Sequence, residues 1–260
     1  MSARGLTLLD GAMGTELVAR GVPTPDGAWS AAAIDAAPEV VAAIHAAYAA
    51  AGATVHTANT FRTRRRQVGP AWQRLARRAV EIARASVPAG HRVAGSVGPV
   101  EDCYRPDRSP GRGAFAEHAE LARALADAGA DVLLCETFPR AEEACAAVRA
   151  CVATGLETWV ALTAGPTASL LSPADVARAA REAVALGAAA VLVDCTAATR
   201  TLAYVEAHAR ARLGVPIGAY ANAGAAGEGL GWGAPREDAA RRYAALAGTW
   251  IEAGASIVGG

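Results

Sequence analysis

The sequence predicts one α/β domain that folds as a parallel (β/α)8 TIM barrel over residues 1–260. Short apolar runs rich in valine alternate with stretches of helical periodicity, and most links between them are short. The length of 260 residues and the hydrophobic fraction of 53% match one barrel of ordinary size. Eight strands but only seven helices are expected, which leaves the last strand uncovered. We therefore expect the sequence to be truncated at its C-terminal end.

The expected strands are short apolar runs that end in a polar or glycine-containing step. Residues 188–196 (AAAVLVDCT) are too few for an ordinary helix, are rich in valine and include Cys195 near their end. Ligands bind at the carboxyl ends of the strands in sheets of this kind, so a site is expected there. The strands are expected at residues 6–10, 54–57, 92–96, 131–136, 158–163, 188–196, 216–220 and 256–258.

The expected helices show apolar residues at helical spacing and end at glycine or proline. Residues 38–51 place their large apolar side chains on one side, and Gly52 follows. Ser172 and Asp175 form a weak capping box at the start of residues 173–186. The other helices are expected at residues 71–86, 114–128, 141–153, 199–211 and 235–253, and the long link that ends near Gly113 is expected to be a lid or binding loop.

Composition excludes several classes of function. The 25 basic residues balance the 25 acidic ones, so no basic field indicates nucleic acid or an anionic membrane as a partner. All basic residues are arginine, and the absence of lysine excludes Schiff-base chemistry. The five cysteines form no CxxC pair, so neither a disulfide framework nor a zinc ribbon is indicated. Because no signal peptide and no long apolar run is present, we expect a cytoplasmic protein.

Four polar residues stand at expected strand ends. Asp10 precedes two glycines that permit close approach of a ligand, although a tight turn with a capping aspartate explains it equally well. Asn59 could hydrogen-bond a substrate at the barrel mouth. Glu136 follows a nearly continuous apolar run and therefore needs a partner or a function. Cys195 could hold zinc, act as a nucleophile or do neither.

Two further features have simpler interpretations. The arginines of residues 62–66 are expected to form a solvated face, or else to meet an acidic partner or a carboxylate. His56 is expected to be an interior polar residue, because no second histidine follows it at metal-binding spacing.

Several motifs taken together resemble the homocysteine S-methyltransferase family. They are LLDGAMGTEL at residues 8–17, ANTF at 58–61, GSVGP at 95–99, CETF at 135–138 and IVGG at 257–260. The motifs occur in the order of the family and span nearly the whole chain. The resemblance implies a zinc-dependent barrel that methylates homocysteine to methionine.

The resemblance also implies roles for individual residues. Cys195 matches a zinc ligand, and Asp194 stands where the family has asparagine. Two further cysteine ligands are expected immediately after Gly260, and the fourth zinc position is left to the substrate sulfur. Glu136 and Asp10 are expected to hold the substrate ammonium. The looser matches to pocket positions are Asn59, Ser96 and Asn222.

Chain length and two motifs indicate the chemical class of the methyl donor. The chain has no room for cobalamin and folate domains, so a sulfonium such as S-methylmethionine or S-adenosylmethionine is expected, or else betaine. The ETFP step and the GSVGP loop look more like the sulfonium-using branch.

Two alternatives stay open. If the chain ends at Gly260, it could be a barrel without zinc that binds a ligand but does not catalyse. It could also be a lyase or a phosphate-sugar isomerase that uses Glu136 as a base and the glycine-rich loop of residues 224–233 as a phosphate site.

Overall fold

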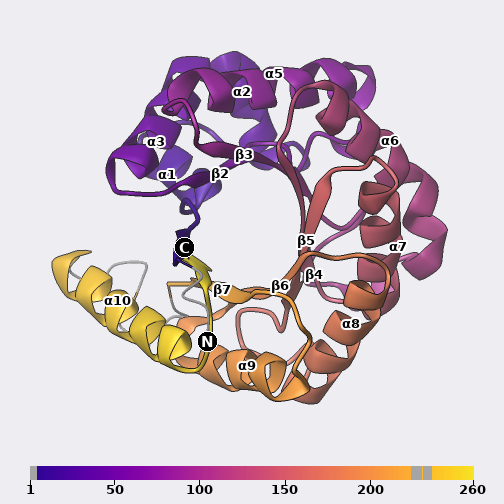
Figure 1. The fold of residues 1–260 in the computed structure, drawn as a ribbon. Coiled ribbons are helices and arrows are strands. Elements are labelled where there is room, and N and C mark those ends of the chain that lie inside the picture. The colour runs from indigo at the N-terminus through magenta and orange to yellow at the C-terminus, as the bar shows by residue number, and fades with distance from the viewer. Residues whose placement is uncertain (1–4, 224–229, 231–235) are drawn as a thin grey trace.

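The computed structural model describes residues 5–223, 230 and 236–260, which fold into one eight-stranded parallel barrel (Figure 1). This confirms the predicted (β/α)8 class. The strands are β1 (Thr7–Leu8), β2 (Val55–Ala58), β3 (Arg92–Val97), β4 (Val132–Phe138), β5 (Glu157–Thr163), β6 (Ala190–Ala197), β7 (Ile217–Asn222) and β8 (Ile257–Gly259).

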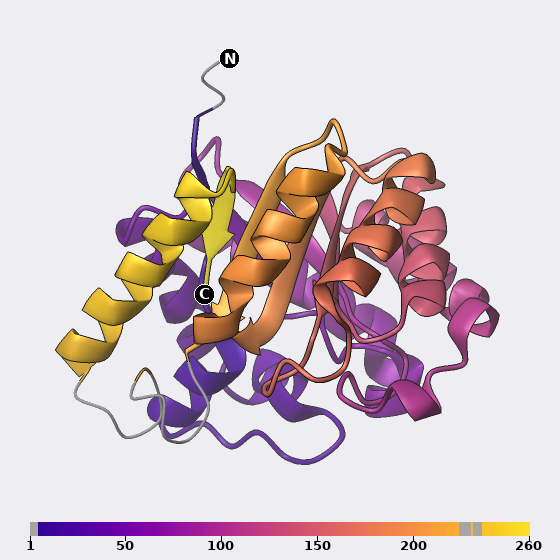
Figure 2. The ribbon, with the colours of Figure 1, turned by 90° about the horizontal axis from the view of Figure 1, so that it is seen from below.

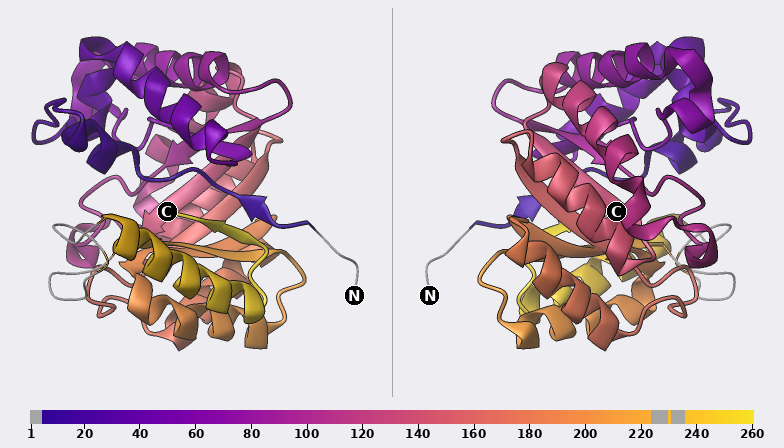
Figure 3. Two further views of the ribbon diagram at one scale, coloured as in Figure 1. Left: turned by 90° about the vertical axis from the view of Figure 1, so that its left-hand side faces the viewer. Right: turned by 90° about the vertical axis from the view of Figure 1, so that its right-hand side faces the viewer.

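Each of the first seven strands is followed by a helix that covers the outside of the sheet. These helices are α3 (Pro38–Ala50), α5 (Trp72–Ser86), α6 (Phe115–Asp127), α7 (Ala141–Val152), α8 (Pro173–Ala185), α9 (Ala198–Ala211) and α10 (Arg236–Glu252). The Ser172–Asp175 capping box is present at α8. Figure 3 shows β1 and β8 between the first helices of the chain and α10.

The sheet closes almost completely. Its order is β1-β8-β7-β6-β5-β4-β3-β2, and all pairs are parallel. One bridge, between Leu9 and Val55, joins β1 to β2. Two residues of β1 are paired in the ladder with β8, and backbone hydrogen bonds of Leu9 and Asp10 extend the contact to both neighbouring strands.

Alternation along the strands divides the core into two layers. One face packs inside the barrel, where Leu9, Val132, Leu134 and Trp159 meet. The other face packs against the helices and contains Leu133, Cys135 and their neighbours. Cys135 is therefore a core thiol.

Several short elements between β1 and β3 were not predicted. They are α1 (Met13–Ala19), η1 (Trp29–Ala32), α2 (Ala33–Ala36), α4 (Arg65–Val68) and η2 (Gly69–Ala71). The long link after β3 carries η3 (Pro106–Arg108) and η4 (Gly111–Ala114). Such elements are fixed by tertiary packing more than by their own periodicity, because they are shorter than a stable isolated helix.

The chain enters β1 at the edge of the barrel opposite to the strand carboxyl ends, which lie along the lower edge of Figure 2. Among the described residues, no helix is both long enough and apolar enough to span a bilayer. The glycine-rich loop considered as a phosphate site, residues 224–233, lies outside the described residues except for Leu230.

Candidate active site

The parallel ladder is broken on β4 and on β6, in both cases at the strand carboxyl end. The register shifts between Cys135 and Phe138 on β4 and between Asp194 and Ala197 on β6. Within these breaks, Thr137 and Cys195 adopt positive φ angles of 62° and 46°. Such a backbone costs about 1–3 kcal/mol for a residue other than glycine and is concentrated at functional sites.

Glu136 lies in the β4 break and is held by hydroxyl groups from two other strands. Ser96 on β3 donates a short hydrogen bond to Oε1, and Tyr220 on β7 donates one of 2.9 Å to Oε2. Burial raises the pKa of the Glu136 carboxyl, and the two hydroxyl donors partly oppose that rise. The carboxylate is thus oriented but has no cationic partner among these contacts.

Cys195 lies in the β6 break, next to the buried Asp194. The Thr137 hydroxyl donates to Asp194 Oδ2 at 2.8 Å and lies 3.5 Å from Cys195 Sγ. The Cys195 carbonyl accepts hydrogen bonds of 3.1 Å each from Thr163 and Asn222. The two donors hold the Cys195 carbonyl from the neighbouring strands β5 and β7.

Burial governs the protonation of this pair. It raises the pKa of the Cys195 thiol well above its ordinary value, and Asp194 adds to the rise. Burial and the nearby Glu136 raise the pKa of Asp194 to about 7. The Cys195 thiol therefore needs a nearby cation to exist as a thiolate at neutral pH.

The long loop after β3 reaches the same place. Its Cys103 is buried, and Tyr104 lies close enough to Asn222 for a hydrogen bond. Burial raises the pKa of the Cys103 thiol, as it does that of Cys195. The expectation of a binding loop is consistent with this position over the strand ends.

Asp10 and Asn59 lie just beyond the ends of β1 and β2 and make different contacts. The Thr57 amide donates to Asp10 Oδ2 at 2.8 Å, and burial raises the pKa of Asp10 to about 8, with a smaller contribution from Glu136. Both polar atoms of the Asn59 side chain bind Ser30. The Ser30 hydroxyl donates to Asn59 Oδ1 at 2.7 Å, and Asn59 Nδ2 donates to the Ser30 carbonyl at 2.8 Å. Asn59 therefore joins β2 to η1, and both of its polar side-chain atoms are engaged.

Two glycines of the predicted motifs, Gly14 and Gly98, leave space for an aromatic wall that consists of Trp29 and Phe61. Trp29 packs edge-on against Phe61, with ring centroids 6.2 Å apart. A Cβ on Gly14 would stand 2.2 Å from the Trp29 ring, and a Cβ on Gly98 would stand 2.4 Å from the Phe61 ring. The glycines are needed for these close approaches, and Trp29 stays 40% exposed.

Comparison with known proteins agrees with this geometry. The family model described as homocysteine S-methyltransferase matches residues 7–260. The chain is 30% identical to the homocysteine S-methyltransferase of Escherichia coli, with 100% of this chain and 92% of that protein covered. It is 32% identical to YbgG of Bacillus subtilis, a homocysteine S-methyltransferase, with coverages of 98% and 89%. The chain belongs to the homocysteine S-methyltransferase family.

Solved structures of the family show the same fold. The metallated form of the Escherichia coli homocysteine methyltransferase MmuM superposes with a TM-score of 0.80 at 28% identity, covering 99% of this chain and 91% of that one. The carboxyl transferase domain of Rhizobium etli pyruvate carboxylase gives a TM-score of 0.57 at 13% identity, which shows the barrel fold alone. The protein is thus an enzyme of the homocysteine S-methyltransferase type.

The Cys195 thiol is of a kind that zinc takes as a ligand. It is half-buried at a strand carboxyl end, on a residue whose carbonyl accepts hydrogen bonds from β5 and β7. Zinc takes thiolate ligands and removes their protons, which offsets the raised pKa of this thiol. A catalytic zinc site needs three protein ligands, so Cys195 needs partners.

Sequence reasoning missed two residues of this homocysteine S-methyltransferase site. Tyr220 contacts Glu136, and Thr137 links Asp194 to Cys195. The sequence did offer one signal for these residues. Thr137 directly follows a predicted strand and Glu136, and Tyr220 ends a predicted strand two positions before Asn222. The strained backbone that turns Thr137 toward Cys195 could not be predicted, because it depends on the register break.

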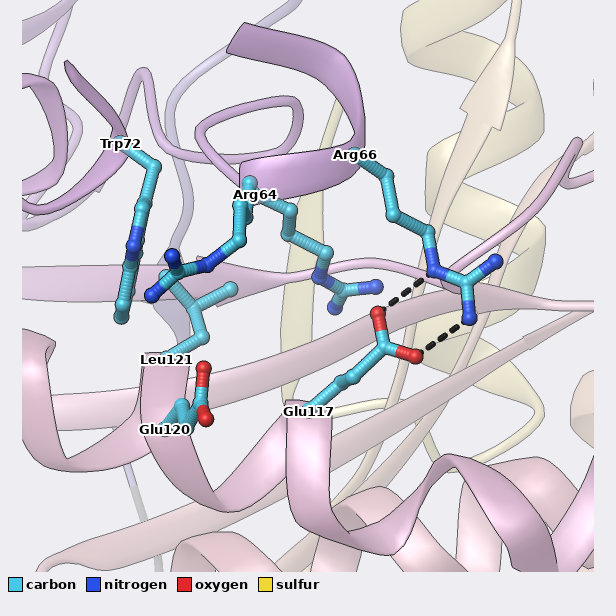
Figure 4. Close-up of a pocket in the computed structure, with 7 residues that line it drawn as sticks. Arg64, Arg66, Trp72, Glu117, Glu120 and Leu121 are labelled. Atoms are coloured by element: carbon cyan, nitrogen blue, oxygen red, sulfur yellow. Dashed lines mark hydrogen bonds and ion pairs between the residues drawn. The ribbon is translucent and has the colours of Figure 1, made fainter. Parts of the chain in front are cut away.

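The expectation that the arginine run forms a solvated face is wrong for Arg64, which is 3% exposed. Its guanidinium donates to the Gly98 carbonyl and lies 3.3 Å from His118 Nδ1. Figure 4 shows the neighbouring Arg66 paired with Glu117, where Nε donates to Oε2 at 2.6 Å. The groove there, of about 430 Å3, lies on the outside of the barrel between α4 and α6.

Proposed function

We propose that this enzyme transfers a methyl group from a sulfonium donor to the thiol of homocysteine and forms methionine, with zinc as its metal. We propose Cys195 as one zinc ligand and expect two cysteines after Gly260 as the others. The observation that carries the proposal is the meeting of Glu136, Thr137, Asp194 and Cys195 at two strained strand ends, in a chain of this family.

The position of β8 supports the proposal that two zinc-binding cysteines follow Gly260. The Tyr243 hydroxyl donates to the Gly259 carbonyl at 2.8 Å, and the Ala221 amide donates to the same hydroxyl at 3.0 Å. Tyr243 contacts Ala221, and the next residue, Asn222, donates to the Cys195 carbonyl at 3.1 Å. A chain that continues from Gly260 therefore starts at the rim that carries Cys195.

Bound zinc would supply the positive charge that keeps the substrate sulfur as a thiolate at neutral pH. The residues of the chain position the rest of homocysteine. Glu136 and Asp10 both have raised pKa values because they are buried, so an ammonium group that enters between them gains two charge-assisted hydrogen bonds and keeps both carboxyls ionised. Ser96 and Tyr220 fix the direction in which Glu136 accepts.

The aromatic wall supports a cationic donor. Trp29 and Phe61 present ring surface near the ends of β1 and β2, and a sulfonium is attracted to the face of an aromatic ring. The Arg62 guanidinium already stands 5.3 Å from the centre of the Phe61 ring, so the exposed face of Trp29 is the better position for the donor.

The test is methionine formation by the full-length protein with homocysteine and, separately, S-methylmethionine, S-adenosylmethionine and betaine. The proposal predicts turnover with a sulfonium and loss of turnover in Cys195→Ala. Turnover with betaine alone would overturn the choice of donor. Full activity of a folded Cys195→Ala variant would overturn the metal assignment.

A further inference from the structure

One buried carboxylate binds both ends of the long loop that follows β3. Glu143 lies in the first turn of α7, and its side chain is fully buried. The Val100 amide donates to Glu143 Oε1 at 2.8 Å, and the Ser109 hydroxyl donates to Glu143 Oε2. A single side chain therefore joins the two ends of residues 100–109, a segment that we call the clasped loop.

Two further hydrogen bonds fix the C-terminal end of the clasped loop. The Arg140 guanidinium, directly before α7, donates to the Ser109 carbonyl at 3.0 Å. The Gly111 amide donates to the Ser109 hydroxyl at 3.2 Å. The loop end is thus anchored to the start of α7, the helix that follows the β4 break with Glu136.

The charge of Glu143 is balanced inside the protein. His118 on α6 lies with Nε2 3.4 Å from Glu143 Oε1 and with Nδ1 3.3 Å from the guanidinium of the buried Arg64. Burial alone would raise the pKa of Glu143, but hydrogen bonds to its carboxylate lower that pKa below its ordinary value. A buried charge is tolerated when it is paired and hydrogen-bonded, and this carboxylate meets both conditions.

The middle of the clasped loop meets the active site. Cys103 is buried, and Tyr104 lies close to Asn222, which donates to the Cys195 carbonyl at 3.1 Å. Asp102 accepts the Tyr104 amide at 2.8 Å in a local turn. Since both ends of the loop are tied to Glu143, the position of Tyr104 over the strand ends depends on that carboxylate.

We propose that Glu143 is a positioning residue for methyl transfer, which ties down both ends of residues 100–109 and so holds Tyr104 beside Cys195. The inference rests on the proposed function and adds the part of the chain that covers the homocysteine site. A weaker clasp leaves a smaller fraction of the enzyme with the loop in place, and the apparent affinity falls with that fraction. KM for homocysteine rises, whereas kcat is largely kept because bound substrate favours the closed loop.

The first test is steady-state kinetics of full-length Ser109→Ala, with homocysteine varied at a saturating sulfonium donor. This variant removes one anchor and leaves Glu143 opposite Arg64. We expect KM for homocysteine to rise about 10-fold with kcat largely unchanged, as loss of a hydrogen bond to a charged group predicts. Glu143→Gln should act in the same direction, because glutamine offers one acceptor oxygen to two donors. A purely structural role would lower the active fraction, and so kcat, at an unchanged KM.

The second test needs no turnover. Hydrogen exchange of residues 100–109, followed by mass spectrometry, reports how often the loop opens. We expect exchange about 10-fold faster in Ser109→Ala than in the original protein. Ser86→Ala is the matched control: its hydroxyl donates to the Ile82 carbonyl at 2.6 Å at the end of α5, so its loss should leave exchange in the clasped loop unchanged.

Tyr104→Ala tests whether the clasp acts through the loop. It should raise KM for homocysteine by itself, and adding Ser109→Ala should raise KM little further, because residues that act as one unit are not additive. Additive increases in KM, or unchanged exchange in Ser109→Ala, overturn the proposal. A full-length protein without turnover overturns the proposed function instead, and the exchange measurement still decides whether the clasp exists.

Discussion

Burial sets the chemistry of single side chains in this barrel. Glu136 and Asp10 have raised pKa values because water is excluded from them, whereas hydroxyl and amide donors lower those values. Cys195 is held as a thiol for the same reason. These groups are therefore arranged to gain when a cation enters, whether it is an ammonium group or a metal ion.

Replacing Glu136 by glutamine keeps the size and one oxygen that accepts a hydroxyl, but it removes the charge. We expect KM for homocysteine to rise about 10–100-fold, since a hydrogen bond to a charged group is worth about 1.5–3 kcal/mol. Ser96→Ala keeps the charge and should raise KM less. Steady-state kinetics at varied homocysteine measures both; an unchanged KM in folded Glu136→Gln would show that this carboxylate does not bind the ammonium.

His208 on α9 predicts a pH dependence of stability. Burial lowers its pKa to about 4, whereas its unfolded value is about 6.5. Between these values the unfolded chain binds the proton and the folded protein does not, so stability falls as pH drops from about 6.5 to 4, by up to about 3 kcal/mol.

The His208→Leu variant lacks this titration. Its free energy of unfolding, measured by urea titration at several pH values, should depend less on pH across that window. If the variant and the original protein lose stability in parallel, the His208 imidazole does not titrate as its burial indicates.

At the scale of secondary structure, the sequence analysis succeeded where a pattern is local. The helices α3 and α5 to α10 begin and end within one or two residues of the expected positions, because their apolar periodicity lies within the segment. The short elements α1, α2 and α4 and the breaks in β4 and β6 depend on contacts with distant parts of the chain, so no local pattern predicted them.

The N-terminus of α8 gives a local stability prediction. The Ser172 hydroxyl accepts a hydrogen bond from the Asp175 amide at 3.2 Å, and the Asp175 carboxylate accepts one from the Ser172 amide at 3.3 Å. Ser172→Ala should lower the free energy of unfolding by about 1 kcal/mol. Ser169→Ala, at an exposed hydroxyl outside the helix, is the control and should have little effect in the same urea titration.

At the scale of the whole molecule, barrel closure depends on a glycine. A Cβ on Gly218 of β7 would stand 2.4 Å from the Ile257 carbonyl oxygen of β8, which is backbone and cannot move aside alone. Gly218→Ala should therefore destabilise the protein by about 1–3 kcal/mol or more.

Gly248→Ala in α10 is the matched control. No atom lies within 4 Å of its added Cβ, so the change should stabilise the helix by about 0.5–1 kcal/mol. Thermal unfolding of the two variants should give shifts of opposite sign. A Gly218→Ala protein as stable as the original would mean that β7 and β8 can separate without cost.

The barrel could be predicted from alternating patterns, but the neighbours within the site could not. Glu136 and Cys195 were singled out as isolated strand-end residues, whereas their link through Thr137 depends on the sheet register. Asn59 was expected at the mouth, but its amide is engaged by Ser30, 29 positions earlier. Arg64 was expected in solvent because charge runs usually are, and the turn before α4 buries it instead.

The most direct test of the central claim is the absorption spectrum of the cobalt-substituted full-length protein during titration with homocysteine. The account predicts a thiolate-to-cobalt charge-transfer band that strengthens as the substrate thiol adds one more sulfur ligand, and that is clearly weaker in Cys195→Ala. A spectrum without this band, or a band that does not change with homocysteine and is unchanged in Cys195→Ala, would contradict a methyl transfer in which the thiol is activated at Cys195.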